Sequence, residues 1–289
     1  MSINWYPGHM AKTRRLMLED MGQVDMVCEV MDARIPMASR NPDLGRIAAH
    51  KRRMIALNRA DQADPKLTAR WAEHFRAEGY TVIETDSQRG NFLPQFSAAA
   101  SVCCQDLLER NAAKGLSGKR IRIMIFGVPN VGKSSFINRL LNKKSAIAAD
   151  KPGVTRKKQW FSLPGGFDFM DTPGMLWPKI DDDATGYKLA FTGTIRDEIL
   201  DQEDLACHLI MTLCRMAPAA LSERYGVPLE RDELTIGEAF DYLEKMAASR
   251  GFRISGGGVD IERMSRVLMD EFRSGKLGRI TLEAPPEAR

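Results

Sequence analysis

Apolar and polar residues follow two distinct patterns along the chain. Short, mostly apolar runs bounded by Gly, Pro, Asn or Asp are typical of buried strands, whereas apolar residues at every third or fourth position indicate helices. Buried runs are expected at residues 24–31, 53–58, 80–84 and 121–126, and an antiparallel hairpin at 159–163 and 167–170. Helices are expected at residues 10–21, 65–78 and 93–111, with a short helix opened by Asn41-Pro42-Asp43.

The order of these elements predicts the fold class. Strands that alternate with helices indicate a mainly parallel sheet covered by helices on both faces. After about residue 185 the strand pattern fades, and helices are expected at 195–216, 218–225, 235–249 and 259–274. We therefore predict an α/β domain over residues 1–180 and a small all-helical domain over residues 181–289.

Composition restricts the class of protein and the kinds of site that are expected, but it does not indicate a function. The 289 residues are 44% hydrophobic and carry a formal charge of +4, as in an ordinary globular protein that can contact nucleic acid but need not. The five cysteines have no CxxC spacing, so neither a disulfide framework nor a zinc cage is expected. Cys207 and Cys214 lie seven residues apart in an apolar helical stretch and are expected to be buried thiols.

The same survey predicts the compartment. No apolar run approaches the ~20 residues of a membrane span, and the first residues show neither a signal-peptide core nor an Arg-rich transit segment. A cytoplasmic protein without a membrane partner is expected. Its basic residues gather in local clusters, each of which taken alone is most simply a solvated surface: Arg14-Arg15, Lys51-Arg52-Arg53, Lys119-Arg120, Lys143-Lys144 and Arg156-Lys157-Lys158.

A phosphate-binding loop follows the apolar run at 121–126. Residues 127–134 fit the pattern GxxxxGK[ST], between a strand and an apolar-faced helix as that motif requires. Backbone N–H groups of such a loop surround phosphates at the positive end of the helix. Lys133 would reach the β- and γ-phosphates, and the Ser134 hydroxyl would bind Mg²⁺. The residues expected to contact the phosphates are Asn130, Val131, Gly132, Lys133, Ser134 and Ser135.

Two further segments belong with this loop. The strand at 167–170 ends in Asp171-Thr172-Pro173-Gly174, where Asp171 can hold Mg²⁺ through water and the Gly174 N–H can face the γ-phosphate. Thr155 lies between the loop and this motif, so it is the candidate to meet both Mg²⁺ and the γ-phosphate.

The base is predicted to be guanine. Asn58-Arg59-Ala60-Asp61 follows an apolar strand, and a carboxylate there can accept hydrogen bonds from N1–H and N2–H₂ of guanine, which adenine lacks. The usual pattern is NKxD, so Arg59 replaces a lysine, but its stem and guanidinium can still cover the base plane. The loop that ends at Ser87 could offer a backbone N–H to guanine O6.

The order of these motifs is permuted. In ordinary GTPases the base-recognition motif comes last, whereas residues 58–61 here precede the phosphate loop at 127–134. A closed α/β domain tolerates such a permutation because its termini can lie close together. The permutation also leads the chain from the Asp171 motif directly into the helical region, so nucleotide-dependent movement at 172–185 would be passed on covalently.

Together the motifs resemble a known family. They are similar, in order, to those of the ribosome biogenesis GTPase A family (RbgA/YlqF) of circularly permuted GTPases. The resemblance covers essentially the whole chain and rests on residues 5–12 (WYPGHMAK), 32–36 (DARIP), 58–61 (NRAD), 127–135 (GVPNVGKSS), 171–174 (DTPG) and 189–193 (LAFTG). It implies GTP and GDP as ligands, with Mg²⁺, and GTP hydrolysis on a late precursor of the large ribosomal subunit and its rRNA.

The resemblance also bears on catalysis. Ras-like enzymes orient the attacking water with a glutamine just after DxxG, and Met175 occupies that position here. The residues alone leave open whether His9 is structural or catalytic; the resemblance implies that it is catalytic, alongside Lys133 and Thr155. Asn130 has two readings: it caps the loop backbone, or, as in similar GTPases with this asparagine, it helps to bind K⁺ beside the phosphates.

Three functions are compatible with these features. The first is an assembly factor of the large subunit that hydrolyses GTP slowly alone and faster on the ribosome, and that is a monomer off it. The second is an RNA- or ribosome-binding scaffold that uses GTP as a structural ligand. The third is a permuted GTPase of the small subunit, although the additional barrel or zinc module expected there is not evident in the sequence.

Overall fold

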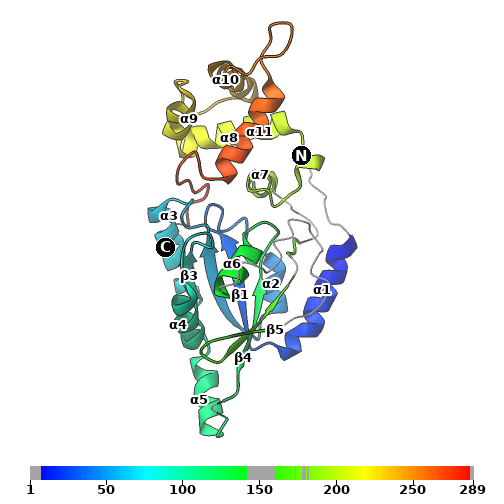
Figure 1. Ribbon diagram of the computed structural model, residues 1–289, viewed down its shortest axis with the longest axis vertical. Helices are drawn as coiled ribbons and strands as arrows, with labels where there is room; N and C mark the ends of the chain where they lie inside the picture. The colour runs from blue at the N-terminus through cyan, green and yellow to red at the C-terminus, as the bar shows by residue number, and fades with distance from the viewer. Residues whose placement is uncertain are drawn as a thin grey trace.

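One six-stranded sheet organises the first half of the molecule (Figure 1). The computed structural model describes residues 8–116, 118–141, 160–172, 174–177, 180 and 182–286, with side chains from residue 14 onward except at 199. The strand order is β3-β2-β1-β4-β6-β5, parallel throughout except for the antiparallel β5–β6 hairpin. The strands are β1 (Met26–Asp32), β2 (Arg52–Asn58), β3 (Thr81–Thr85), β4 (Ile121–Phe126), β5 (Trp160–Leu163) and β6 (Phe167–Asp171).

Helices cover both faces of the sheet because alternate residues of each strand point to opposite sides. One face packs Ile121, Ile123 and Ile125 of β4 into a cluster with α4 and α6. The other face contributes Met124 and Phe126 of the same strand to a cluster with α1 and α2, while β2 packs against α3. These helices are α1 (Gly8–Asp20), α2 (Pro42–Ile47), α3 (Pro65–Ala77), α4 (Leu93–Cys103), α5 (Gln105–Ala113) and α6 (Lys133–Leu140), with a 3₁₀ turn η1 (Met21–Gln23).

The sheet and the mainly parallel α/β architecture confirm the fold predicted from the sequence. One predicted helix in the sheet domain was wrong. The expected helix at 93–111 is two helices, because the backbone leaves helical geometry at Cys104 (φ −109°, ψ 15°), whose side chain is buried beside Met26.

Among the described residues after β6 the regular elements are helices, as the fading strand pattern predicted. They are α7 (Asp183–Phe191), η2 (Asp197–Ile199), α8 (Gln202–Met216), α9 (Pro218–Tyr225), α10 (Ile236–Ser249) and α11 (Ile261–Arg273). α7 was not expected, and the continuous helix predicted at 195–216 was wrong in its first turns. Asp201 is the reason, since its carboxylate accepts from Glu203 N and Asp204 N and begins α8 at residue 202.

α8 is the core of this helical region. Cys207 and Cys214 are both buried on it, as expected. Among the described residues no single helix is long and apolar enough to span a membrane, although the bent pair of α8 and α9 would be by length and composition together.

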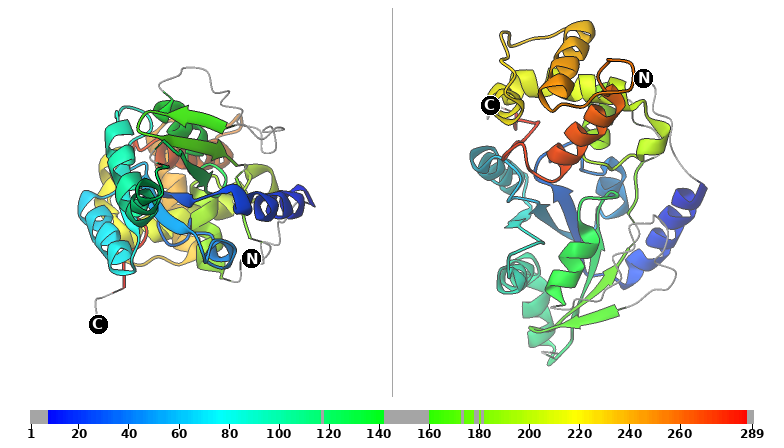
Figure 2. Two further views of the ribbon diagram at one scale, coloured as in Figure 1. Left: turned by 90° about the horizontal axis from the view of Figure 1, so that it is seen from below. Right: turned by 45° about the horizontal axis from the view of Figure 1, so that its top comes forward.

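The C-terminal segment returns to the sheet domain and lies beside α3 (Figures 1 and 2). Ile280 N donates to Gln62 O, and the indole of Trp71 on α3 donates to Glu283 O. The buried Glu283 carboxylate accepts from Met37 N at 2.6 Å and pairs with Lys188 of α7 at 3.1 Å. One side chain thus ties the sheet domain to the helical region, and the division at residue 180 stays a prediction.

We expect Glu283→Ala to lower the free energy of unfolding by about 1.5–3 kcal/mol, because it leaves buried donors without a charged acceptor. Equilibrium denaturation measures this. Glu244→Ala, which removes an exposed carboxylate on α10, is the matched control and should change stability by less than about 0.5 kcal/mol. Equal effects of the two variants would contradict the structural role of Glu283.

Candidate guanine nucleotide site

The phosphate-binding loop joins β4 to α6 at the carboxyl edge of the sheet. Two glycines are needed there. A Cβ on Gly127 would lie 2.7 Å from Val30 O, and a Cβ on Gly132 would lie 2.5 Å from Asn58 Nδ2. Gly132 also has φ +86°, which disfavours other residues, and it stands at the N-cap of α6. The loop therefore exposes its backbone at the positive end of a helix, as anion binding requires.

The described residues predicted for phosphate and Mg²⁺ lie at or beside this loop. Lys133 Nζ is 2.6 Å from Asp171 Oδ1 at the end of β6, and the lysine side chain is only 9% exposed. Ser134 is exposed on the first turn of α6, and Ser135 behind it is half-buried. A phosphate bound by Lys133 would therefore lie beside the carboxylate expected to hold Mg²⁺.

The DTPG segment contacts the phosphate loop directly. A Cβ on Gly174 would lie 3.0 Å from Pro129 Cα, so this glycine permits close packing of two backbones. Thr172 Oγ1 donates to Ile125 O at 2.8 Å, which fixes the segment to β4. Strand pairing of β4 with β6 thus brings together motifs about 40 residues apart.

Asn58 joins the predicted base site to the phosphate loop. Its buried Nδ2 donates to Val131 O at 2.8 Å, and its Oδ1 accepts from Thr85 Oγ1 and Ser87 Oγ at 3.1 and 2.6 Å. The ends of β2 and β3 are thereby held against the P-loop. Ser87, predicted for its backbone near guanine O6, has its side chain turned to Asn58.

Asp61, the carboxylate predicted to bind guanine, is an exposed residue three positions after Asn58. Although the residue is exposed as a whole, partial burial of its carboxyl raises its pKa, and the charge of Asp86 raises it further. The neighbouring Arg59 and Arg89 oppose that rise.

Arg59 makes contacts that the sequence did not predict. It has φ +60°, and its guanidinium donates to Asn130 O of the phosphate loop at 3.0 Å. Its Nε lies 3.7 Å from Asp32 Oδ2, and burial lowers the pKa of the guanidinium. The guanidinium is therefore held beside the loop, which leaves the aliphatic stem to lie along a base.

A buried ion pair stands behind Arg59. Asp32 accepts from Arg34 at 2.8 and 2.9 Å, and both side chains are 1% exposed. Burial alone would raise the pKa of Asp32, but the adjacent guanidinium of Arg34 outweighs burial and lowers it. Arg34 also donates to Phe272 O and Arg273 O, so this pair links the base side of the site to the end of α11.

The helical region contacts the phosphate loop through Asn130. The amide nitrogen of Asn130 donates to Gly193 O just after α7 at 2.5 Å. Arg273 holds that corner by donating to Phe191 O and Ala190 O, and it pairs with Asp197 at 2.6 Å. The roles of Arg34, Gly193 and Arg273 were not predicted, although the resemblance included the motif DARIP, which contains Arg34, and the motif LAFTG, which contains Gly193.

Other expected residues are only partly described. The backbone of His9 lies in the first turn of α1, but its side chain is outside the described residues. Thr155 lies wholly outside them. Met175, in the position of the Ras-like glutamine, is 1% exposed and points into the core. Its backbone carbonyl accepts from Asn41 Nδ2 at 3.1 Å, a contact not evident from the sequence, where Asn41 reads only as a helix cap.

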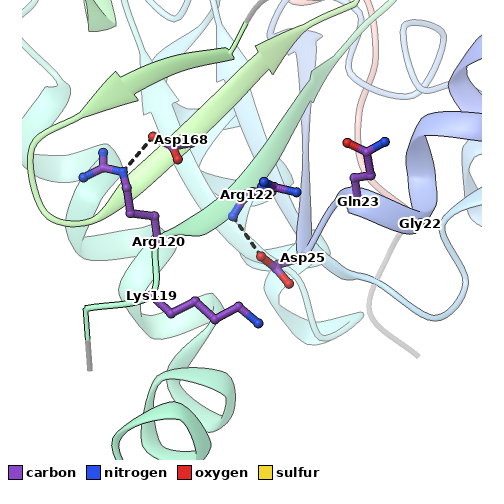
Figure 3. Close-up of a pocket in the computed structure, with 7 residues that line it drawn as sticks. All are labelled: Gly22, Gln23, Asp25, Lys119, Arg120, Arg122 and Asp168. Atoms are coloured by element: carbon purple, nitrogen blue, oxygen red, sulfur yellow. Dashed lines mark hydrogen bonds and ion pairs between the residues drawn. The ribbon is translucent and has the colours of Figure 1, made fainter. Parts of the chain in front are cut away.

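A polar hollow of about 390 Å³ lies at the other end of the sheet (Figure 3). Arg120 forms an ion pair with Asp168 at 2.7 Å in this hollow, and the Asp25 carboxylate accepts a hydrogen bond from the backbone N–H of Arg122 at 2.9 Å. Because it opens at the amino ends of β1 and β4, it is separate from the nucleotide loops. Its lining residues are Gly22, Gln23, Asp25, Lys119, Arg120, Arg122 and Asp168.

Comparison with known proteins places this arrangement in a family. A profile described as "50S ribosome-binding GTPase" matches residues 122–232, which begin at the strand before the P-loop. The base-recognition segment around Asn58 precedes the matched residues, as the permuted order requires.

Relatives match over the whole length. A protein named ribosome biogenesis GTPase A from Bacillus cereus is 40% identical over 287 residues, covering 99% of this chain and 95% of the relative. The crystal structure of GNP-bound YlqF from T. maritima is similar at a TM-score of 0.64 and 29% identity, covering 96% of this chain and all of that one. A GDP-bound YlqF structure has the same TM-score, 28% identity, and covers 94% and 100%. The chain therefore belongs to the ribosome biogenesis GTPase A family and is a guanine-nucleotide-binding GTPase.

Proposed function

We propose that this GTPase acts in late maturation of the large ribosomal subunit, where it binds a subunit precursor and its rRNA. The observation that carries the nucleotide-binding part of the proposal is the Asn58 side chain, which joins the predicted guanine-recognition segment to the phosphate loop. Membership of a ribosome biogenesis family and the "50S" in the matching profile support the large subunit as partner. We place its action in the cytoplasm, and we propose that it is a monomer off the ribosome.

Guanine specificity is assigned to Asp61. Its carboxylate is the acceptor for N1–H and N2–H₂, and Arg59, Asn58 and Ser87 shape the loop around it. A bound base that lacks those donors would leave the carboxylate without a partner, which costs affinity.

The residues at the phosphate loop fit Mg²⁺. The Ser134 hydroxyl, the Asp171 carboxylate and Thr155 are the oxygen ligands proposed for it, and oxygen is the ligand that Mg²⁺ prefers. When bound, the ion would neutralise charge on the β- and γ-phosphates. K⁺ remains a separate proposal: the bond to Gly193 uses the amide nitrogen of Asn130, so its amide oxygen is the atom proposed to face the cation.

Hydrolysis needs a group other than Met175 to orient water. We assign this role to His9 on the resemblance, with Lys133 and Thr155 stabilising the phosphates. The alternative, a scaffold that binds GTP without hydrolysis, has the buried Met175 in its favour, whereas membership of a GTPase family favours hydrolysis.

The structure narrows which cations remain for rRNA. Lys51 donates to Val24 O, Arg52 pairs with Asp106 and Arg53 with Glu29, so this cluster serves the fold. Arg14 pairs with Asp43 and Arg15 with Glu19. The clusters at 143–144 and 156–158 lie outside the described residues. The helical region 181–289 is also proposed as a ribosome-binding surface.

We expect Asp61→Asn to weaken GDP binding at least tenfold and to favour xanthosine diphosphate, because an amide offers a donor where guanine also has donors. Titration with both nucleotides measures this. Asp64→Asn is the matched control: Asp64 caps α3 by accepting from Leu67 N, and asparagine caps equally well. Undiminished GDP affinity in Asp61→Asn would rule out the assignment.

His9→Ala is expected to lower GTP turnover on large-subunit particles at least tenfold, because it removes the proposed water-orienting group. GTP affinity should change by less than about twofold, since a water-orienting group acts mainly in the transition state. Single-turnover hydrolysis and nucleotide titration separate the two effects. His50→Ala, at an exposed position in the same domain, is the control. Wild-type turnover in His9→Ala would remove His9 from the mechanism.

Sedimentation with ribosomal particles tests the function as a whole. With a non-hydrolysable GTP analogue the protein should pellet with large subunits or their precursors, more than with GDP, and binding should fall steeply with salt as for phosphate contacts. Binding to small subunits alone would favour the small-subunit alternative. Nucleotide-independent binding, with no stimulation of turnover by subunits, would favour the scaffold.

A further inference from the structure

Met175 is fixed at both backbone atoms. Its N–H donates to Gly127 O of the phosphate loop at 3.2 Å, and its carbonyl accepts from Asn41 Nδ2 at 3.1 Å. The residue after DTPG is therefore clamped between the phosphate loop and the first turn of α2.

The Met175 side chain points inward from this clamp. It is 1% exposed and belongs to a buried cluster that includes Met17 of α1 and Met21 just after it. Phe126 of β4 and Met170 of β6 complete the wall behind it. α1 thus shares a buried apolar cluster with the position that carries the water-orienting glutamine in other GTPases.

The first turn of α2 contacts α1 as well. Asn41 Oδ1 caps α2 by accepting from Asp43 N at 2.9 Å, and Asn41 N donates to the buried Glu29 carboxylate at 3.0 Å. Asp43 in turn pairs with Arg14 of α1 at 3.4 Å, with the carboxylate side chain only 12% exposed. One turn of α2 therefore holds both the DTPG segment and α1.

The direction of α1 gives these contacts a consequence. The helix runs antiparallel to β1, so its N-terminal end lies toward the carboxyl edge of the sheet, where the phosphate loop is (Figures 1 and 2). His9 lies in the first turn of α1, about 12 Å of helix rise from Met17. Because an α-helix is rigid over this length, fixing the position of α1 at Met17 also fixes the position of its first turn, which contains His9.

We propose that Asn41 and Met175 are positioning residues for hydrolysis, which fix α1, and with it His9, relative to the phosphate loop. The inference rests on the proposed function, which assigns the water-orienting role to His9. The Met175 side chain cannot orient water. Instead, by being buried in the same cluster as α1, it helps to position the helix that carries His9. The amide of Asn41 holds the DTPG backbone at the position that this packing requires.

Asn41→Ser tests the proposal. Serine keeps an oxygen to cap α2 but has no donor that reaches Met175 O, so loss of one buried hydrogen bond should lower single-turnover GTP hydrolysis roughly three- to tenfold. GDP affinity should stay within about twofold of wild type, and amide hydrogen exchange over residues 14–20 should become faster. Asn111→Ser, the same change at a buried position on α5, should alter none of the three quantities.

A combined variant separates this proposal from the assignment of His9. If Asn41 acts through α1, Asn41→Ser should cause no further loss of turnover in a His9→Ala protein. Additive losses, or wild-type turnover and exchange in Asn41→Ser alone, would overturn the positioning role while leaving His9 in place. Wild-type turnover in His9→Ala would instead overturn the assignment of His9 on which the proposal rests.

Discussion

The nucleotide site depends on one buried amide. The side chain of Asn58 is 1% exposed and is bonded on both its oxygen and its nitrogen, to three residues from two other segments of the chain. An amide can do this because it carries donors and acceptors at once, and a buried amide that lost a partner would be costly. The carboxyl ends of β2 and β3 and the phosphate loop are therefore held in one geometry, with Asp61 placed three residues from the point of attachment.

Around that amide, charged side chains join the site to the helical region at two places. On the base side, Asp32 and Arg34 form a buried pair whose guanidinium reaches the last carbonyls of α11. On the phosphate side, Asn130 bonds to the carbonyl of Gly193. Both routes end near Arg273, which itself holds the end of α7. In a permuted GTPase the DTPG segment also leads directly into α7, so covalent and noncovalent links converge on the same corner.

This convergence gives a physical reason for the permuted order. In the parallel sheet the order of strands in space is what places the loops, and strand pairing is indifferent to where the chain begins. Moving the chain termini to another loop therefore preserves the site, but it changes which segment connects the sheet domain to the region that follows it. Here that segment is the one expected to respond to the γ-phosphate. Glu283, from the returning C-terminal segment, closes the connection by contacting both the loop at residues 37–38 and Lys188.

The sequence by itself determined the strands, their parallel arrangement and the phosphate loop, because these follow from local periodicity and from glycines that the backbone requires at fixed positions. It also determined the permuted order of the motifs, which is read from spacing along the chain, and it predicted guanine recognition at residues 58–61. It could not determine that the helix expected at 93–111 is interrupted at Cys104, because tertiary packing decides that boundary. Nor could it determine that α8 begins only at residue 202, because the Asp201 cap decides where that helix starts.

Only the tertiary structure decided the contacts of Arg59, Arg34, Asn41 and Met175, since each joins residues far apart in the chain. Asn41 reads as a helix cap from its neighbours, and its second bond, to Met175 O, spans 134 positions. From the sequence, Met175 shows only that no glutamine follows DTPG. In the structure it is buried in the same cluster as Met17 of α1, which gives it a structural role. The local sequence determines which donors, acceptors and apolar side chains each segment carries, and the tertiary structure determines which of them are in contact.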